Sequence, residues 1–138
     1  MDCLSGVWKK ILIKEVINTK EAPDAIGTYS QGIRIGEFIY TSGQISIDPQ
    51  TGNLKTGDIS VEIRQVLDNL NAVLKAGGSS LQSAVKLTVF MIDLTLFPIV
   101  NEVFKEYFPI KPPARSTVQV SALPMGVRIE IDAVGTTE

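Results

Sequence analysis

Two segments of the chain place their apolar residues three or four positions apart, which is the spacing of an amphipathic helix. The first follows Asp58 or Ser60, either of which can cap a helix, and stops at the Gly77–Gly78 pair. The second has Pro98 in its first turn, where a proline is tolerated. Each predicted helix must bury one apolar stripe, and this limits the possible folds. The apolar positions are Ile63, Val66, Leu67, Leu70, Val73 and Leu74 in the first segment, and Val100, Val103, Phe104, Tyr107 and Phe108 in the second.

The segments around these helices alternate polar and apolar residues or are rich in β-branched residues, as strands are. Six strands are predicted, at residues 11–17, 33–35, 38–41, 84–92, 114–121 and 127–134. Two helices placed among these strands must cover one face of a single sheet. This predicts an α+β fold, a two-layer sandwich of a mixed β-sheet with both helices on one face. The other face is left for water or for another subunit.

The length of 138 residues and the 44% hydrophobic content suit one domain with one core. We expect residues 13–138 to form this domain and residues 1–12 to be an N-terminal extension. The first residues lack the order of a signal peptide, in which basic residues precede a sustained apolar stretch. Cys3 is the only cysteine, so an internal disulfide cannot form, and a reducing, cytoplasmic location is expected.

Charge and composition argue against several classes of function. The 13 basic and 15 acidic residues give a net charge of −2, so the sequence offers little support for binding a nucleic-acid backbone. It contains no apolar run of the ~20 residues that a membrane helix needs. A chain without histidine and with one cysteine carries no zinc signature, and its acidic residues form no clustered motif for magnesium. We therefore expect neither a metal nor a cofactor.

The last two predicted strands, joined by a turn at 121–126, read as a hairpin. Alternation along the first strand places Arg115, Thr117 and Gln119 on one face. If the two apolar faces match, Thr117 or Gln119 lies opposite Glu130, and Arg115 shares a polar face with Glu130. A polar sheet face is usually just solvated, and a surface pair of this kind contributes ~0.2–1 kcal/mol. The pattern alone therefore favours an ordinary surface over a site.

A resemblance to a known family changes that balance. The segment 113–120, PARSTVQV, with Leu123–Pro124 and 127–133, VRIEIDA, is similar to the C-terminal signature of the Rid family, also called YjgF. The segments 25–32, AIGTYSQG, and 41–45, TSGQI, resemble that family's N-terminal motifs. The matching segments come in order with family-like spacing, from about residue 13 to residue 135.

The resemblance implies a chorismate-mutase-like (YjgF-like) fold and a homotrimer with clefts between subunits. It implies hydrolysis of reactive 2-enamine and 2-imine intermediates, such as 2-aminoacrylate and 2-iminobutyrate, to 2-keto acids and ammonia. Arg115 would grip the substrate carboxylate through charge-assisted hydrogen bonds. Glu130 would position or deprotonate the attacking water.

The same resemblance implies five further substrate-binding residues. Tyr29 would line the cleft, although it also suits a loop tyrosine packed on the sheet edge. Ser42 would supply a hydroxyl or be an ordinary strand-end serine, and Gly43 would let the backbone approach the substrate closely or simply make a turn. Asn101 would reach the cleft from the second helix or bond to backbone. Thr117 departs from the family, where cysteine is frequent, and this puts the substrate preference in question.

Two alternatives to the enzyme stay open. The chain suits a non-catalytic regulatory trimer that binds small carboxylates, since Arg115 would serve that purpose equally well. RNA cleavage has been attached to some relatives, but the near-neutral charge and the lack of histidine argue against it.

Overall fold

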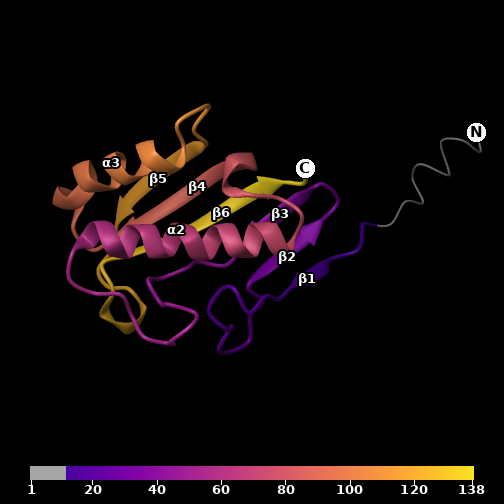
Figure 1. Ribbon diagram of the computed structural model, residues 1–138, viewed down its shortest axis with the longest axis horizontal. Coiled ribbons are helices and arrows are strands. Elements are labelled where there is room, and N and C mark those ends of the chain that lie inside the picture. Colours follow the sequence, from indigo (N-terminus) through magenta and orange to yellow (C-terminus); the bar gives the residue numbers. More distant parts are fainter. Residues whose placement is uncertain (1–11) are drawn as a thin grey trace, which may run out of the picture.

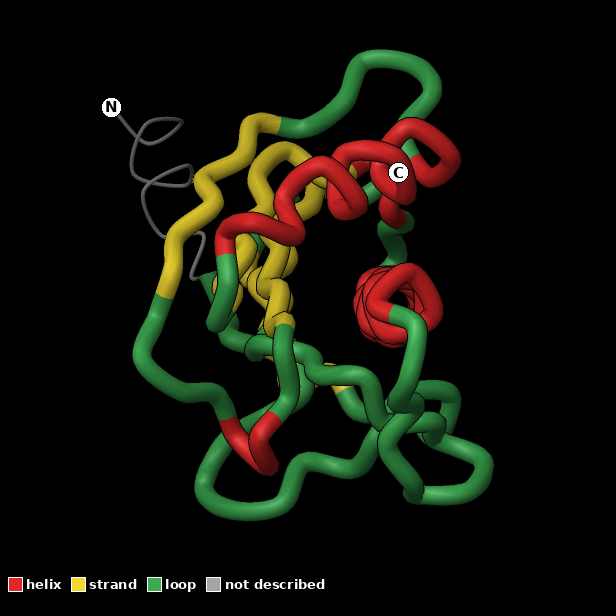
Figure 2. The backbone as a smooth tube through the Cα atoms, turned by 90° about the vertical axis from the view of Figure 1, so that its left-hand side faces the viewer, coloured by secondary structure: helices red, strands yellow, loops and turns green. Residues whose placement is uncertain are grey.

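The computed structural model describes residues 12–138, and its six strands form one mixed sheet in the order β1-β2-β3-β6-β4-β5 (Figure 1). Every neighbouring pair is antiparallel except β4 and β5, which are parallel. Both long helices lie on the same side of the sheet (Figure 2), which confirms the predicted α+β two-layer fold. The strands are β1 Glu15–Ile17, β2 Gly32–Ile35, β3 Phe38–Thr41, β4 Ala84–Met91, β5 Ala114–Gln119 and β6 Ile129–Thr136; the helices are α2 Ile59–Ala76 and α3 Phe97–Tyr107, with short 3-10 turns at Leu81–Ser83, Leu94–Leu96 and Pro124–Gly126.

Helix α2 begins and ends where the sequence predicts. The carboxylate of Asp58 accepts a hydrogen bond from the backbone N–H of Ser60 at 3.0 Å, which satisfies one free donor of the first turn. At the other end, the N–H of Gly77 donates to carbonyls of the last turn, and Gly78 adopts a φ of +91°. The predicted apolar stripe is fully buried and packs on the sheet to form the core; its members are Ile63, Val66, Leu67, Leu70, Val73 and Leu74.

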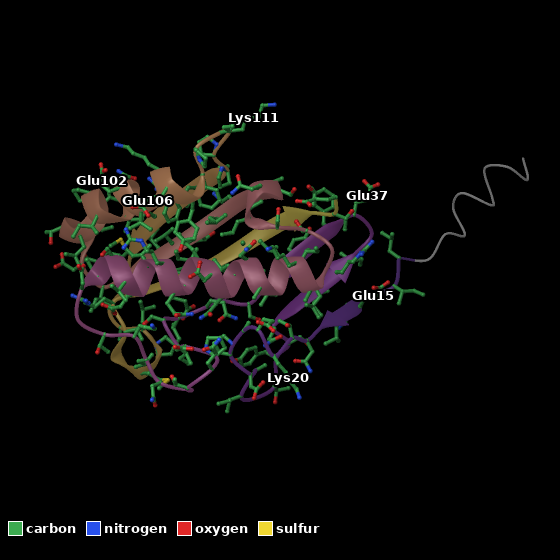
Figure 3. The ribbon with its side chains drawn as sticks, viewed as in Figure 1. Glu15, Lys20, Glu37, Glu102, Glu106 and Lys111 are labelled. Carbon is green, nitrogen blue, oxygen red and sulfur yellow. The ribbon has the colours of Figure 1, made fainter. Side chains whose placement is uncertain are left out.

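Helix α3 has Pro98 in its first turn, as predicted, and packs against α2. Arg64 of α2 donates two hydrogen bonds, of 3.2 and 2.9 Å, to the carboxylate of Glu106 on α3, which is labelled in Figure 3. Lys111 lies at the tip of the loop that joins α3 to β5 and has a φ of 48°. This helix and loop carry the chain from β4 to its parallel neighbour β5.

The predicted hairpin between the last two strands is wrong, because β4 lies between β5 and β6. A parallel pair needs a crossover connection, and α3 provides one between β4 and β5. The turn after β5 then carries the chain past the end of β4 rather than folding β6 back onto β5. At its C-terminal end, β4 is hydrogen-bonded to the segments that follow β5 and precede β6. Val120 N–H donates to the Met91 carbonyl, and Ile92 N–H donates to the Arg128 carbonyl.

The register of the strands also places Arg115 and Glu130 on opposite faces of the sheet, although the predicted hairpin put them on one face. Arg115 pairs with Leu87, which pairs with Ala133, and both of these apolar residues are buried under the helices. Glu130 alternates with the buried positions of β6 and therefore faces the opposite way. Arg115 and Glu130 thus do not share a face of the sheet within one chain. The apolar face of β5 was assigned to the wrong side, because at this sheet edge Val118 stays exposed while α3 covers Arg115.

Several large apolar side chains are solvent-exposed on the sheet face that lies away from the helices. Val16, Phe38, Tyr40 and Val118 are between 41% and 64% exposed. Val16 pairs with Ile33, which pairs with Tyr40, so these three form one row across β1, β2 and β3. We call this side of the sheet the open face.

The predicted N-terminal extension, apart from its last residue, lies outside the described residues, as does Cys3. The strand predicted at 11–17 is present as the shorter β1. Among residues 12–138, no helix is long and apolar enough to span a bilayer. In the same range, no three or more His, Cys, Asp or Glu side chains are grouped so that they could hold a metal ion.

Candidate active site

Arg115 projects from β5 toward α3, and side chains of that helix hold it. Arg115 Nη2 donates a hydrogen bond of 2.9 Å to Asn101 Oδ1. The guanidinium carbon Cζ lies 5.0 Å from the ring centroid of Phe97 and 5.1 Å from that of Phe104. These three α3 residues are four and three positions apart, so they lie along one face of the helix.

A cavity of about 550 Å³ opens beside this arginine. Within residues 12–138, Arg115 forms no ion pair with any carboxylate. Burial lowers the pKa of Arg115 from its usual value, but an arginine remains cationic at neutral pH. A guanidinium that faces a cavity without an internal counterion is suited to bind a carboxylate from outside. The cavity is lined by Pro98, Asn101, Glu102, Phe104, Lys105, Phe108, Pro112, Pro113 and Arg115.

Thr117 lies two residues further along β5, on the same face as Arg115. Its hydroxyl Oγ1 is buried and has no hydrogen-bond partner in the described part of the chain. A buried hydroxyl without a partner carries a desolvation cost. Thr117 therefore has unused hydrogen-bonding capacity two residues from Arg115. We refer to Arg115, Asn101 and Thr117 as the Arg115 group.

Glu130 belongs to a second cluster, built where the segment 42–44 runs beside β6. Gln44 and Ile131 exchange two backbone hydrogen bonds, of 2.9 and 3.1 Å, which hold that segment in place. A Cβ atom on Gly43 would stand 2.4 Å from Glu130 Oε2 and 2.8 Å from its Cδ. The group that approaches the backbone at Gly43 is therefore the Glu130 carboxylate, which can lie there because the residue is glycine.

Ser42 directly precedes Gly43 in the chain, and together with Tyr29 it lines a second cavity, of about 560 Å³. The hydroxyl of Ser42 donates a hydrogen bond of 2.6 Å to the Ser30 carbonyl, and its N–H donates to the Gln31 carbonyl at 2.9 Å. The Tyr29 side chain is largely exposed. We refer to Tyr29, Ser42, Gly43 and Glu130 as the Glu130 group.

Two features of its surroundings raise the pKa of Glu130. Burial raises its pKa above the usual value, and the nearby charge of Asp132 raises it further. Burial also raises the pKa of Asp132, while a hydrogen bond from Thr88 and the charge of Lys86 oppose that rise. Two carboxylates on the open face thus hold protons more readily than ordinary surface carboxylates, which is a property of groups that transfer protons.

The seven residues predicted for the site therefore fall into two groups on different parts of the chain. Arg115, Asn101 and Thr117 come together under α3, while Glu130 lies on the open face with the segment 42–43. Phe97 was not among the predicted site residues, and Phe104 was predicted only as part of the apolar stripe of the second helix. The signal was present, because positions 97, 101 and 104 share one helical face. Only the parallel placement of β5 reveals that Arg115 lies against that face.

Comparisons with known proteins agree along nearly the whole chain. Residues 19–137 match the family model described as Endoribonuclease L-PSP. A RutC family protein of Pyrococcus horikoshii is 49% identical over 126 residues, which cover 91% of this chain and 100% of that protein. The human 2-iminobutanoate/2-iminopropanoate deaminase is 48% identical over 123 residues, which cover 89% of this chain and 90% of the human one.

A solved structure gives the same result for the fold. A Yersinia pestis protein of unknown function, described as a member of the conserved Rid protein family, superposes with a TM-score of 0.88 at 45% identity. The match covers 91% of this chain and 100% of the Yersinia chain. With a family model, relatives near 48% identity and a common fold in agreement, this chain belongs to the Rid family.

Proposed function

We propose that this protein is a deaminase that hydrolyses 2-enamine and 2-imine acids, such as 2-aminoacrylate and 2-iminobutyrate, to 2-keto acids and ammonia. The observation that carries the proposal is Arg115, a cation without an ion-pair partner in residues 12–138, held by Asn101 beside a cavity. The name of the human relative supports the same chemistry. The substrates are reactive products of pyridoxal-phosphate enzymes, so the role would be to limit metabolite damage.

The reaction needs little beyond positioning and one proton acceptor. Arg115 binds the substrate carboxylate through charge-assisted hydrogen bonds, which places the adjacent C=N carbon in the site. An enamine such as 2-aminoacrylate first takes the imine form by moving a proton from its nitrogen to its methylene carbon. Water attacks the C=N carbon while Glu130 accepts one of its protons, and Glu130 then gives that proton to the nitrogen, which yields a carbinolamine. Glu130 next carries the hydroxyl proton of the carbinolamine to the nitrogen, the C–N bond breaks, and the 2-keto acid and ammonia leave. The pKa of Glu130 is raised toward the working pH by burial and by the charge of Asp132, and proton transfer becomes more effective as a group's pKa approaches that pH.

The two groups of site residues must meet for this mechanism to operate. Because Arg115 and Glu130 face opposite sides of one sheet, we expect the Arg115 group of one subunit to meet the Glu130 group of the next. A closed homotrimer satisfies this arrangement, since a head-to-tail contact repeated around a ring gives every subunit the same two neighbours. The exposed apolar residues of the open face support such an association.

An imine-trapping assay tests the proposed reaction. A dehydratase generates 2-iminobutyrate from threonine, and semicarbazide competes for the imine as it forms. We expect the protein to suppress semicarbazone formation and Arg115→Ala to lose that effect while keeping the oligomeric state of the wild type. Equal suppression by Arg115→Ala would refute the assigned role of this residue, and no suppression by the wild type with any imino acid would refute the deaminase.

Glu130→Gln separates the deaminase from a regulatory trimer that only binds carboxylates. For the enzyme we expect this variant to lose turnover and to keep binding a 2-keto acid, measured by calorimetry. A wild-type protein that binds the keto acid but shows no turnover would favour the binding role. RNA cleavage, the activity named in the family description, is tested in parallel by incubating wild type and Arg115→Ala with RNA. Cleavage lost in that variant would favour the nuclease over the deaminase.

A further inference from the structure

We infer that Phe97 and Phe104 are positioning residues, which hold the Arg115 guanidinium by cation–π contact in the orientation that binds the substrate carboxylate. This inference rests on the proposed function and adds a reason why arginine suits position 115, since a planar guanidinium stacks on aromatic rings and still offers donors to a carboxylate. We call the two rings and the guanidinium that contacts them the α3 stack.

The guanidinium of Arg115 lies over both rings. Phe97 and Phe104 are seven residues apart, which is about two turns of a helix, so they lie on the same side of α3. Arg115 Cζ is 5.0 Å from the centroid of the Phe97 ring and 5.1 Å from that of the Phe104 ring. Both distances are within the ~6 Å at which a ring attracts a cation. Asn101 stands between the rings on the same helical face and accepts one hydrogen bond from Nη2.

This arrangement fixes the guanidinium without neutralising it. Phe104 is buried and Phe97 is partly buried, so both rings have little freedom to move. The Asn101 amide accepts a hydrogen bond but carries no charge, and no acidic residue in the described range pairs with Arg115. The hydrogen bond to Asn101 uses one of the five N–H donors of the guanidinium and leaves the others for a ligand. The stack therefore pre-organises a cation that keeps its charge and its donors for a carboxylate.

Leucine and tyrosine substitutions test the stack. Leucine keeps most of the apolar packing but has no π face, whereas tyrosine keeps the ring. We expect Phe97→Leu and Phe104→Leu each to raise the Kd for 2-ketobutyrate and the KM for the imine by about 2- to 30-fold, the range that cation–π contacts give. The kcat should stay within about twofold, because the chemistry at Glu130 is untouched. Phe97→Tyr and Phe104→Tyr should restore binding to near the wild-type level.

Val103→Ala is the matched control. Val103 is a buried residue of α3 that does not line the Arg115 cavity, so this variant loosens the helix without touching the stack. It should leave the Kd for 2-ketobutyrate unchanged, and thermal unfolding of every variant checks that each is folded. The factor by which Arg115→Lys weakens binding should also be smaller in the Phe97→Leu/Phe104→Leu background than in the wild type, because the double variant has already lost the contact.

The outcomes separate the stack from the reaction. If the wild type binds 2-ketobutyrate but hydrolyses no imine, the proposed reaction fails, and the binding measurements still test the stack. If the leucine variants bind as the wild type does, or Val103→Ala weakens binding equally, or tyrosine is no better than leucine, the stack inference is overturned. A wild type that binds no 2-keto acid would overturn it as well, since Arg115 would then have no carboxylate to orient.

Discussion

Replacing Gly43 by alanine tests whether the Glu130 carboxylate is placed by the space that glycine leaves. The added Cβ would stand 2.4 Å from Glu130 Oε2, 2.8 Å from Cδ and 3.1 Å from Cγ. Non-bonded heavy atoms prefer separations of about 3.5 Å, so the carboxylate has to move by roughly 1 Å. The backbone at Gly43 is outside the positive-φ region, so alanine adds no backbone strain there.

The expected effect falls on turnover rather than on stability. The atoms in conflict belong to the end of a flexible side chain, and moving them off their rotamer costs about 0.5–1.5 kcal/mol. A displacement of this size at a catalytic group lowers the rate by about 100-fold. In the imine-trapping assay we therefore expect Gly43→Ala to lower kcat by about two orders of magnitude. Because Arg115 is unaffected, the Kd for 2-ketobutyrate should stay within a few-fold of the wild-type value.

A double-mutant comparison decides whether Gly43 acts through Glu130. If it does, Gly43→Ala should have almost no further effect on kcat in a Glu130→Gln background, because the group it displaces is already inactive. A kcat equal to that of the wild type in the single variant would refute the reasoning. So would an equal loss in both backgrounds, because Gly43 would then act on something other than Glu130.

Three further variants test the electrostatics and the packing. Asp132→Asn removes a charge that helps raise the pKa of Glu130, so that pKa should fall. The acidic limb of the kcat–pH profile should then move to lower pH. A limb that stays in place or moves to higher pH would contradict this assignment. Arg128→Ala leaves the buried Glu62 carboxylate, which is 4% exposed, without its cationic partner. We expect the free energy of unfolding, measured with urea at a fixed protein concentration, to fall by about 3 kcal/mol. An unchanged urea midpoint would mean that the ion pair does not stabilise the fold. Thr117→Val removes a buried hydroxyl without a partner and should raise the free energy of unfolding by about 1 kcal/mol, whereas a fall would mean that the hydroxyl is paired.

The sequence predicted the layers of this fold because those depend on local patterns. The stripe from Ile63 to Leu74 needs only a 3.6-residue period, and its ends need only a cap at Asp58 and glycines at 77 and 78. Such signals are contained within a few neighbouring residues. The helices and their common face could therefore be read directly, without knowledge of the sheet order.

The order of the strands depends on contacts between distant segments, and here the prediction failed. Two neighbouring strands with a short turn suggest a hairpin, but β4 pairs with both and separates them. The error then reversed the face of β5, because its apolar Val118 lies on the open side and its charged Arg115 lies under α3. A strand at the sheet edge can place a cation toward a helix when rings and an amide stabilise it there. No periodicity in β5 alone contains that information.

The site residues came from family motifs, and the structure explains how the chain positions them. Asn101 and Arg115 are in contact, and Gly43 gives Glu130 its position, although these pairs are distant in sequence. Phe97 belongs to no quoted motif and was found only once β5 was placed beside β4. Motifs supplied the candidate reacting groups, whereas the residues proposed to support them required the fold.

The central claim is that Arg115 of one subunit and Glu130 of another form each site, and mixing two inactive variants tests it most directly. Arg115→Ala and Glu130→Gln should each be inactive in the imine-trapping assay. When equal amounts are unfolded together and refolded, random assembly into head-to-tail trimers should give sites with both native residues, and roughly a quarter of the wild-type activity should return. Activity that never rises above that of the separate variants would contradict a site shared between subunits.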